Sequence, residues 1–295
     1  MSPRSAEAQR RERRVDAAAG GVFAGGMTDP AGLIPDPAAA GSSAPTGATD
    51  PKALQQLDEG WSRGLAVVAH PDDMEFGAAA AVARWTAQGK EITYCLVTSG
   101  EAGIDGIEPE RCGPLREAEQ VESCRFVGVS ELDFLHLADG VLEYGVDLRR
   151  AITASVRRHR PEIVITNNFR DTWDGATTLN MADHIAVGRA TLDAVRDAGN
   201  RWVFHDQAEQ GLEPWGGVRQ VWAAGSPRSR HGVDIGDTFD AGVASLAAHA
   251  AYIEGLGWED FDPEEFLDGM ARQIGQRLGV TRAATFEVFT AAFGG

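Results

Sequence analysis

The chain has 295 residues, of which 43% are apolar and 24% charged, and this balance is typical of a globular protein and excludes a collagen-like, coiled-coil or wholly disordered chain. Its formal net charge of −17 at pH 7 would repel nucleic-acid phosphates and anionic lipid surfaces, so we expect no nucleic-acid partner. No window approaches about eighteen uninterrupted apolar residues, so we expect no membrane span.

Residues 1–58 are predicted to form a disordered N-terminal extension. The segment has an arginine cluster at 10–14 and continues in Ala, Gly, Pro, Ser and Thr with almost no large side chains. It therefore cannot bury enough apolar surface to offset the entropy of ordering. A transit peptide and a translation start at Met27 remain alternatives. Residues 59–295 are expected to form one α/β domain with a helical C-terminal part.

Short apolar runs alternate with helical periodicity from residue 65 onward. The first run, LAVVA at 65–69, is typical of a strand buried on both faces of a parallel sheet. Periodic alanines at 77–88, closed by Gly89, indicate a helix, and 92–97 supplies the next strand. The same patterns predict strands at 132–135, 163–166, 202–204 and 218–223, and helices at 114–126, 148–159, 182–196, 237–252 and 263–278. The alternation predicts a Rossmann-like, doubly wound, mostly parallel α/β sheet with helices on both faces.

Polar residues follow the first predicted strand directly. His70, Asp72 and Asp73 stand together at its carboxyl end, where open α/β sheets bind their ligands. An imidazole nitrogen and a carboxylate oxygen are good zinc ligands, and three protein ligands with one open position are typical of a catalytic zinc site. The best candidate for the third ligand is His184, at the start of a later predicted helix.

Six segments, in this order, resemble the PIG-L/LmbE-like zinc-dependent N-deacetylases, the family of the GlcNAc-PI de-N-acetylases. They are AHPDDMEFG at 69–77, TSGEAG at 98–103, LREAE at 115–119, FLHLADG at 134–140, ADHIAVG at 182–188 and HGVDIGDT at 231–238. The resemblance covers most of the chain from Gly64 to about Gly255. It implies a metal-dependent hydrolase that removes an N-acetyl or other N-acyl group from an amino sugar or a related small amide.

The resemblance also implies the roles of the central residues. His70, Asp73 and His184 correspond to metal ligands, and Asp72 to the general base that takes a proton from the attacking water and passes it to the leaving amine. The expected metal is Zn²⁺. Fe²⁺ or another divalent ion is the alternative, because a His-Asp-His set does not select zinc by affinity alone.

Four further residues correspond to the surroundings of that site. Glu101, Arg116 and His231 are expected to contact substrate, and Asp183 to orient a ligand imidazole. The residues alone leave other readings open. Glu101 would then be an ordinary loop carboxylate, Arg116 a solvated ion pair with a glutamate of its own helix, and Asp183 a carboxylate at a helix N-terminus.

One position departs from the family pattern, because Met181 stands where many members have a histidine. A thioether can neither stabilise an oxyanion nor protonate a leaving group, and His205, His231 or the metal alone would have to take over. The alternative function is therefore a catalytically impaired LmbE-like protein that acts as a ligand-binding or regulatory module. A dinucleotide-binding protein is excluded, because the first turn lacks GxGxxG.

The sequence says less about the cellular compartment and the oligomeric state of the protein. Three cysteines without a CxxC pair predict neither a disulfide scaffold nor a cysteine-rich zinc site, and favour a reducing, cytoplasmic compartment. No segment identifies an interface, and the family includes several assemblies, so a homo-oligomer is compatible with the sequence.

Overall fold

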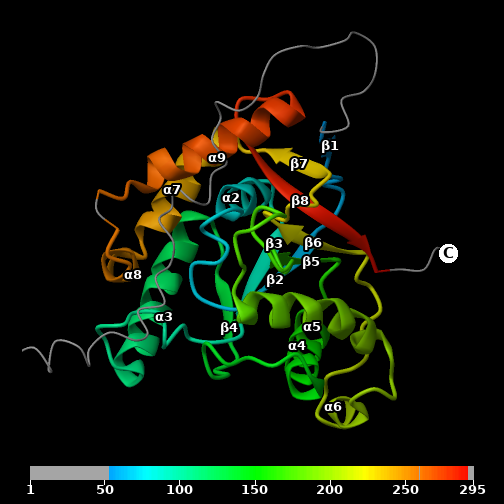
Figure 1. The fold of residues 1–295 in the computed structure, drawn as a ribbon. Coiled ribbons are helices and arrows are strands. Elements are labelled where there is room, and N and C mark those ends of the chain that lie inside the picture. The colour runs from blue at the N-terminus through cyan, green and yellow to red at the C-terminus, as the bar shows by residue number, and fades with distance from the viewer. Residues whose placement is uncertain (1–52, 259, 292–295) are drawn as a thin grey trace, which may run out of the picture.

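The run LAVVA forms most of β2 (Arg63–Val68) and lies inside an eight-stranded sheet of order β1-β7-β8-β6-β5-β2-β3-β4 (Figure 1). The computed structural model describes residues 53–258 and 260–291. The other strands are β1 (Gln55–Gln56), β3 (Glu91–Leu96), β4 (Glu131–Phe134), β5 (Ile163–Asn167), β6 (Gln220–Ala224), β7 (His231–Asp234) and β8 (Ala283–Thr290). Among the strands of the described residues, only β8 runs antiparallel to its neighbours, so the predicted, mostly parallel α/β fold is confirmed.

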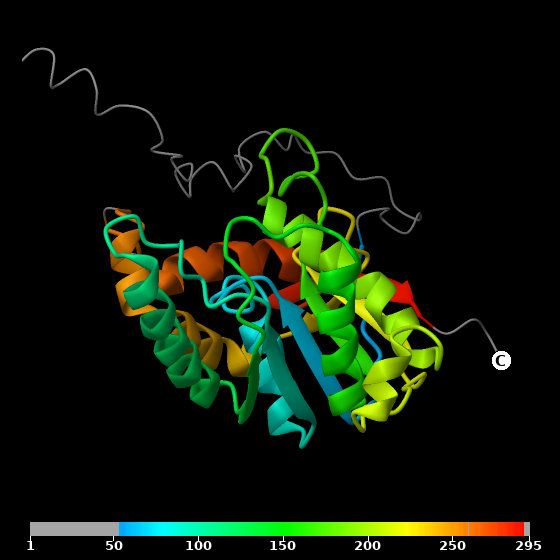
Figure 2. The ribbon, with the colours of Figure 1, turned by 90° about the horizontal axis from the view of Figure 1, so that it is seen from below.

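Helices cover both faces of this sheet. They are α2 (Ala79–Ala87), α3 (Pro109–Phe126), α4 (Val146–His159), α5 (Ala182–Gly199), α6 (His205–Glu209), α7 (Phe239–Ala247), α8 (Ala250–Gly255) and α9 (Pro263–Leu278), with a 3-10 turn, η3 (Gly236–Thr238). Figure 2 shows the sheet between α4 and α5 on one side and α3, α7 and α9 on the other. None of the helices in the described ranges is long and apolar enough to cross a membrane.

The alternation of side chains along β2 explains the two layers. Ala66 and Val68 pack into one apolar core with α2, α7 and α9, whereas Leu65 and Val67 pack into a second core with α4 and α5. A strand with apolar side chains on both faces has to lie in the interior of a sheet. Its carboxyl end, which leads into the HPDD segment, therefore opens at the edge of the sheet between the two helical layers.

The predicted strand at 202–204 is wrong. These residues form a turn between α5 and α6, and their carbonyl groups are bound by a buried side chain instead of a neighbouring strand. The guanidinium of Arg157 donates to the carbonyl oxygens of Val203 (2.8 Å) and Phe204 (3.0 Å). Trp202 is accordingly 81% exposed.

Other boundaries also differ from the expectations. The helix predicted at 237–252 is divided into η3, α7 and α8, with His249 between the last two. The expected helical C-terminal part also contains a strand that was not predicted, β8, between β6 and β7. Residues 53–58 are part of the fold, because β1 pairs with β7 and Leu57 is buried in the core. The rest of the expected extension lies outside the described residues.

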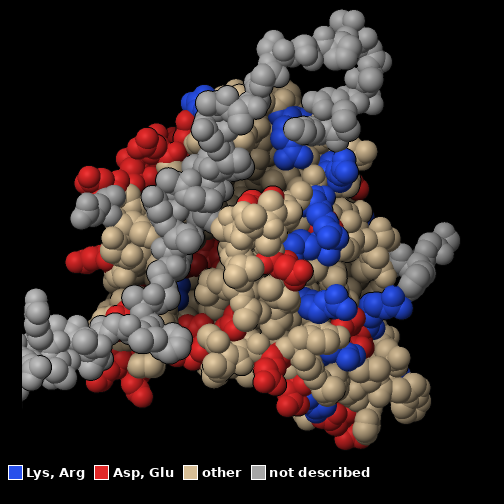
Figure 3. All heavy atoms as spheres, in the orientation of Figure 1, with Lys and Arg blue, Asp and Glu red and all other residues tan. Residues whose placement is uncertain are grey.

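Charge is unevenly distributed over the face of the molecule that Figure 3 shows. On the face seen in Figure 3, acidic side chains gather on the side of α7 and α8, and basic ones on the side of β8. The negative net charge is therefore not spread evenly over this face. The absence of a nucleic-acid partner, which we expect from the net charge, stays a prediction.

Gly188 of the ADHIAVG segment allows α5 to pack closely on the loop after β5. A Cβ atom there would lie 2.4 Å from Cβ of Phe169, whereas a Cβ at Gly269 of α9 would meet nothing within 4 Å. We expect Gly188→Ala to lower the free energy of unfolding by about 1–3 kcal/mol through overpacking. The control Gly269→Ala should leave it unchanged or raise it by up to about 1 kcal/mol. Urea unfolding measures both, and equal effects would contradict this account of Gly188.

Candidate metal centre

The segment after β2 forms a tight turn that is held by its own side chain. The backbone N–H groups of Ala69 and His70 donate to Asp73 Oδ2, at 2.9 and 3.0 Å. Asp72, which lies between His70 and Asp73 in the sequence, adopts a φ of +87°. This left-handed conformation is uncommon for a residue with a side chain. Such conformations cost on the order of 1–3 kcal/mol and cluster at functional sites. With this backbone conformation the side chain of Asp72 contacts Arg116, whereas that of Asp73 accepts from the N–H of Ala69.

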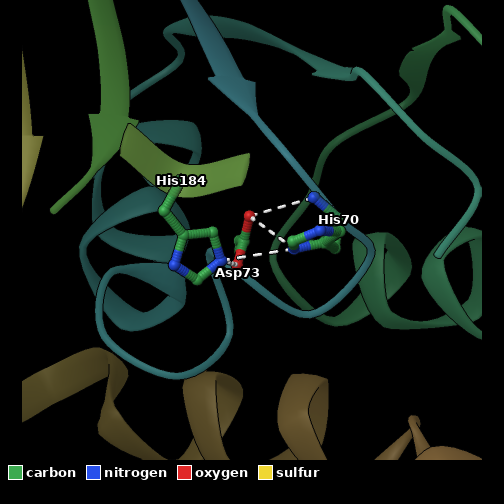
Figure 4. A group of neighbouring side chains, drawn as sticks. All are labelled: His70, Asp73 and His184. Carbon is green, nitrogen blue, oxygen red and sulfur yellow. Dashed lines mark hydrogen bonds and ion pairs between the residues drawn. The ribbon is translucent and has the colours of Figure 1, made fainter. Parts of the chain in front are cut away.

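This turn and the start of α5 bring together His70, Asp73 and His184, far apart in the sequence (Figure 4). His184 Nε2 lies 2.8 Å from Asp73 Oδ1 and 3.2 Å from His70 Nδ1, and His70 Nδ1 lies 3.8 Å from Asp73 Oδ2. The three side chains are at most 6% exposed. The structure therefore gathers these three residues into one buried cluster.

The outer nitrogens of both imidazole rings have acceptors. His70 Nε2 lies 3.0 Å from Asp139 Oδ1, and His184 Nδ1 lies 3.0 Å from the side-chain oxygen of Asn180. In a neutral imidazole the nitrogen that faces such an acceptor carries the proton, so the other nitrogen presents a lone pair. When both rings are neutral, two lone pairs and a carboxylate oxygen therefore face one another. A cation relieves this arrangement, and partners on the outer ring nitrogens are usual for metal-binding histidines.

The pKa shifts of His70 and Asp73 also indicate that the cluster favours a positive charge. Burial lowers the pKa of His70, but hydrogen bonds to Asp139, Asp183 and Asp73 outweigh it and hold this pKa well above its usual value. Burial raises the pKa of Asp73, yet the neighbouring His184 and His70 bring it far below the usual range. Asp73 is therefore an anion, and the site favours positive charge between its side chains.

Asp72 lies beside this cluster, but α3 holds it. Its Oδ2 lies 2.5 Å from Nη2 of Arg116, and its backbone N–H donates to Gln120 (3.0 Å). Burial raises the pKa of Asp72 to about 8, although the Arg116 guanidinium acts in the opposite direction. A carboxyl group with a pKa near neutrality can both take up and release a proton under physiological conditions.

Asp183 and Arg116, two further residues predicted for the site, are both buried. Asp183 accepts hydrogen bonds from the N–H groups of Gly140 (2.7 Å) and Leu142 (3.0 Å) and lies 3.4 Å from His70 Nε2. It thus contacts a ring of the cluster and fixes the loop after β4, so it is more than a helix N-terminal carboxylate. Arg116 is 2% exposed, so the reading as a solvated ion pair is wrong.

Two predicted substrate contacts have contrasting positions. Glu101 Oε1 accepts from the N–H of Asp139 (2.9 Å), and its buried Oε2 has no hydrogen-bond partner in the structure. His231 begins β7, four strands from β2 in the order of the sheet. At roughly 4.8 Å per strand this is about 19 Å from the strand that carries the cluster. The structure does not bring His231 to the cluster.

Sequence reasoning missed three residues at the site: Asp139, Asn180 and Tyr252. Asp139 follows β4 at the same edge of the sheet as His70, and Asn180 stands four residues before His184, so position alone could have suggested both. Tyr252 of α8 stacks on Arg116, with 4.0 Å from the guanidinium carbon to the ring centroid. No local pattern indicates this contact.

Comparison with known proteins places these features in context. Residues 65–195 match the family model PIG-L, described as GlcNAc-PI de-N-acetylase. A diacetylchitobiose deacetylase of Thermococcus kodakarensis is 26% identical over 217 residues, 73% of this chain and 78% of that protein. A 1D-myo-inositol 2-acetamido-2-deoxy-alpha-D-glucopyranoside deacetylase of Thermomonospora curvata is 25% identical over 192 residues, 56% of this chain and 60% of the relative, so the match spans less than two thirds of its length.

The same fold occurs among solved structures. The N,N'-diacetylchitobiose deacetylase from Pyrococcus horikoshii superposes with a TM-score of 0.71 at 22% identity, covering 79% of this chain and 85% of that one. At this identity the likeness extends to the fold, which agrees with the eight-stranded α/β sheet described above.

Removal of one imidazole tests the cluster as a metal site. We expect His184→Ala to lose most of the bound metal after incubation with Zn²⁺ and desalting, because the cluster then retains one nitrogen and one carboxylate. His205→Ala, at the exposed start of α6, is the control and should keep the wild-type content. Elemental analysis gives the stoichiometry. An unchanged metal content in His184→Ala would exclude this residue as a ligand.

Proposed function

The chain belongs to the PIG-L family, and on this premise we propose that it is a metal-dependent N-deacetylase that hydrolyses an N-acetyl or other N-acyl group on an amino sugar or a related small amide. The observation that carries the proposal is the convergence of His70, Asp73 and His184, with Asp72 beside them. The named deacetylases among its relatives support the reaction class.

The metal would be held by His70 Nδ1, the Asp73 carboxylate and His184 Nε2. We propose Zn²⁺, with Fe²⁺ or another divalent ion as the alternative. When bound, such an ion supplies Lewis acidity that activates water and an acyl carbonyl at neutral pH. Asp139 and Asn180 keep the two imidazoles oriented through their outer nitrogens.

Asp72 would act as general base and then as general acid. Its carboxylate takes one proton from the water whose oxygen bonds to the acyl carbon, and it returns that proton to the nitrogen as the carbon–nitrogen bond breaks. The products are a carboxylic acid and a free amine. Burial raises the pKa of Asp72, so its carboxylate is a stronger proton acceptor than that of an exposed aspartate.

The substrate class follows from the relatives and from unused polar atoms. The two relatives described above are named for substrates that carry acetylated amino sugars. The unpartnered oxygen of Glu101 is an acceptor for a sugar hydroxyl.

The free, buried cysteines Cys95, Cys112 and Cys124 support a reducing compartment such as the cytoplasm.

Loss of the carboxylate at position 72 separates catalysis from metal binding. We expect Asp72→Asn to lower kcat by about 10²–10⁴, since an amide cannot shuttle the proton, while the metal content stays at the wild-type level. Amine release from N-acetylglucosaminyl compounds and elemental analysis measure the two quantities. Asp237→Asn, in the exposed η3 turn, is the control. Near-wild-type turnover by Asp72→Asn would exclude Asp72 as the base.

Met181, the N-cap residue of α5, is 45% exposed and stands three residues before His184. We expect Met181→His to raise kcat, because one oxyanion donor is worth about 10²–10³ in rate in other hydrolases. Leu179→His, at an 81% exposed position of the same loop, is the control. No change in kcat would mean that this chain does not use a donor at position 181. Metal binding without turnover of a broad amide panel would instead favour the ligand-binding module.

A further inference from the structure

A buried polar network lies behind the turn that carries Asp72. Its members come from this turn, from α3 and from α7, and each is at most 1% exposed: Glu75, Gln120, Ser123 and Ser245. Glu75 Oε1 accepts from Gln120 Nε2 (2.9 Å) and from Ser123 Oγ (2.9 Å). Ser245 Oγ lies 2.7 Å from Ser123 Oγ and donates to Glu75 Oε1 at 3.5 Å. These side chains are thus paired with one another instead of with solvent.

The network binds both backbone polar groups of Asp72. Gln120 Oε1 accepts from the backbone N–H of Asp72 (3.0 Å), and the backbone N–H groups of Glu75 (2.8 Å) and Phe76 (3.2 Å) donate to the Asp72 carbonyl oxygen. An N–H group only donates, so the Gln120 amide has to turn its oxygen to Asp72 and its nitrogen to Glu75. The residue with a φ of +87° is therefore held on both sides of its Cα atom.

The second oxygen of Glu75 has a different environment. Glu75 Oε2 lies 3.9 Å from His249 Nε2, and neither this oxygen nor the ring nitrogens of His249 have a hydrogen-bond partner among the described residues. Burial lowers the pKa of His249 to about 3, so the ring is neutral near neutral pH and forms no ion pair with Glu75. The hydrogen bonds of the Glu75 side chain are thus all made by Oε1, the oxygen that faces Gln120.

We infer that Gln120 and Glu75 are positioning residues, which hold the backbone of Asp72 in its left-handed conformation and thereby set the direction of its carboxylate. The inference rests on the proposed function, in which that carboxylate moves the proton. The carboxylate itself interacts with Arg116 Nη2 (2.5 Å) and with the side chain of Tyr252, whereas the network acts on the backbone. A positive φ persists only where surrounding contacts hold it, and misplacement of a reacting group by about 1 Å can cost on the order of 10² in rate.

Removal of the Gln120 amide tests the hold on Asp72. Gln120→Met keeps the length of the side chain but leaves the Asp72 N–H without its acceptor. We expect kcat for amine release from N-acetylglucosaminyl compounds to fall about tenfold at unchanged KM and metal content, because the group that moves the proton is displaced while the three proposed ligands stay in place. A rise in KM at unchanged kcat, or a wild-type kcat in the folded variant, would overturn the inference.

An exchange of the two side chains should restore the pairing with a different sequence. In the double variant Gln120→Glu, Glu75→Gln, the carboxylate at position 120 offers one oxygen to the Asp72 N–H, and its other oxygen accepts from the amide nitrogen at position 75. Ser123 Oγ can accept from the same amide and donate to Ser245. We expect the kcat of this double variant to lie within about threefold of the wild-type value, because the two sites are coupled. A folded double variant as slow as Gln120→Met would overturn the inference.

Ser245→Ala is the matched control for a general loosening of the network. The Ser245 hydroxyl is equally buried, but its hydrogen bonds go to Ser123 and, at 3.5 Å, to Glu75. We expect this variant to unfold at a lower urea concentration and to keep the wild-type kcat. A loss of kcat equal to that of Gln120→Met would mean that any weakening of this part of the core slows the reaction, and it would overturn the inference.

Amide hydrogen exchange reports on Asp72 without any turnover. Measured by NMR on protein incubated with Zn²⁺, exchange of the Asp72 N–H should be about tenfold faster in Gln120→Met than in the wild type, and close to the wild-type rate in the double variant. Equal rates in all three proteins would overturn the inference. No turnover by the wild-type protein on any N-acyl compound would instead overturn the proposed function, because the exchange measurement needs no substrate.

Discussion

The constraint on which the site depends is the meeting of two imidazole rings and one carboxylate among side chains that are at most 6% exposed. Asp139 lies 3.0 Å from the outer nitrogen of His70, and Asn180 lies 3.0 Å from that of His184, so both rings are oriented with their other nitrogens toward the cluster. Unpaired polar atoms in a buried place are costly, so such an arrangement persists only where a cation completes it or the fold compensates. Here the fold contributes a strained turn and a helix N-terminus to hold the groups together.

The fold also explains how two neighbouring aspartates acquire different tasks. The left-handed backbone at Asp72 turns its side chain toward α3, while Asp73 folds back over the end of β2. One carboxylate thus becomes part of the cluster, and the other meets a buried arginine. The environments move their pKa values in opposite directions, so Asp73 stays ionised whereas Asp72 takes up a proton more readily than an exposed aspartate.

Periodicity was sufficient to predict the parallel core, because strands buried on both faces leave a continuous apolar run. It was insufficient where side chains replaced the hydrogen bonds of a sheet, as Arg157 does at 202–204, and where β8 joined the sheet from the far end of the chain. The cluster residues could be named from their motifs. The partners that orient them could not, because contacts such as that of Tyr252 with Arg116 depend on how α8 returns to α3.

The consequence of having Met181 in place of the family's histidine depends on where the other histidines of the chain lie. His205 begins α6 beyond the far end of α5, a helix of 18 residues and about 27 Å, and His231 begins a strand at the other side of the sheet. Neither of the two histidines considered as substitutes is placed to replace an imidazole at position 181. Charge that develops on the acyl oxygen would thus have to be met by the ion bound at the cluster, so this chain should depend on the charge of its metal more than a relative with a histidine at that position.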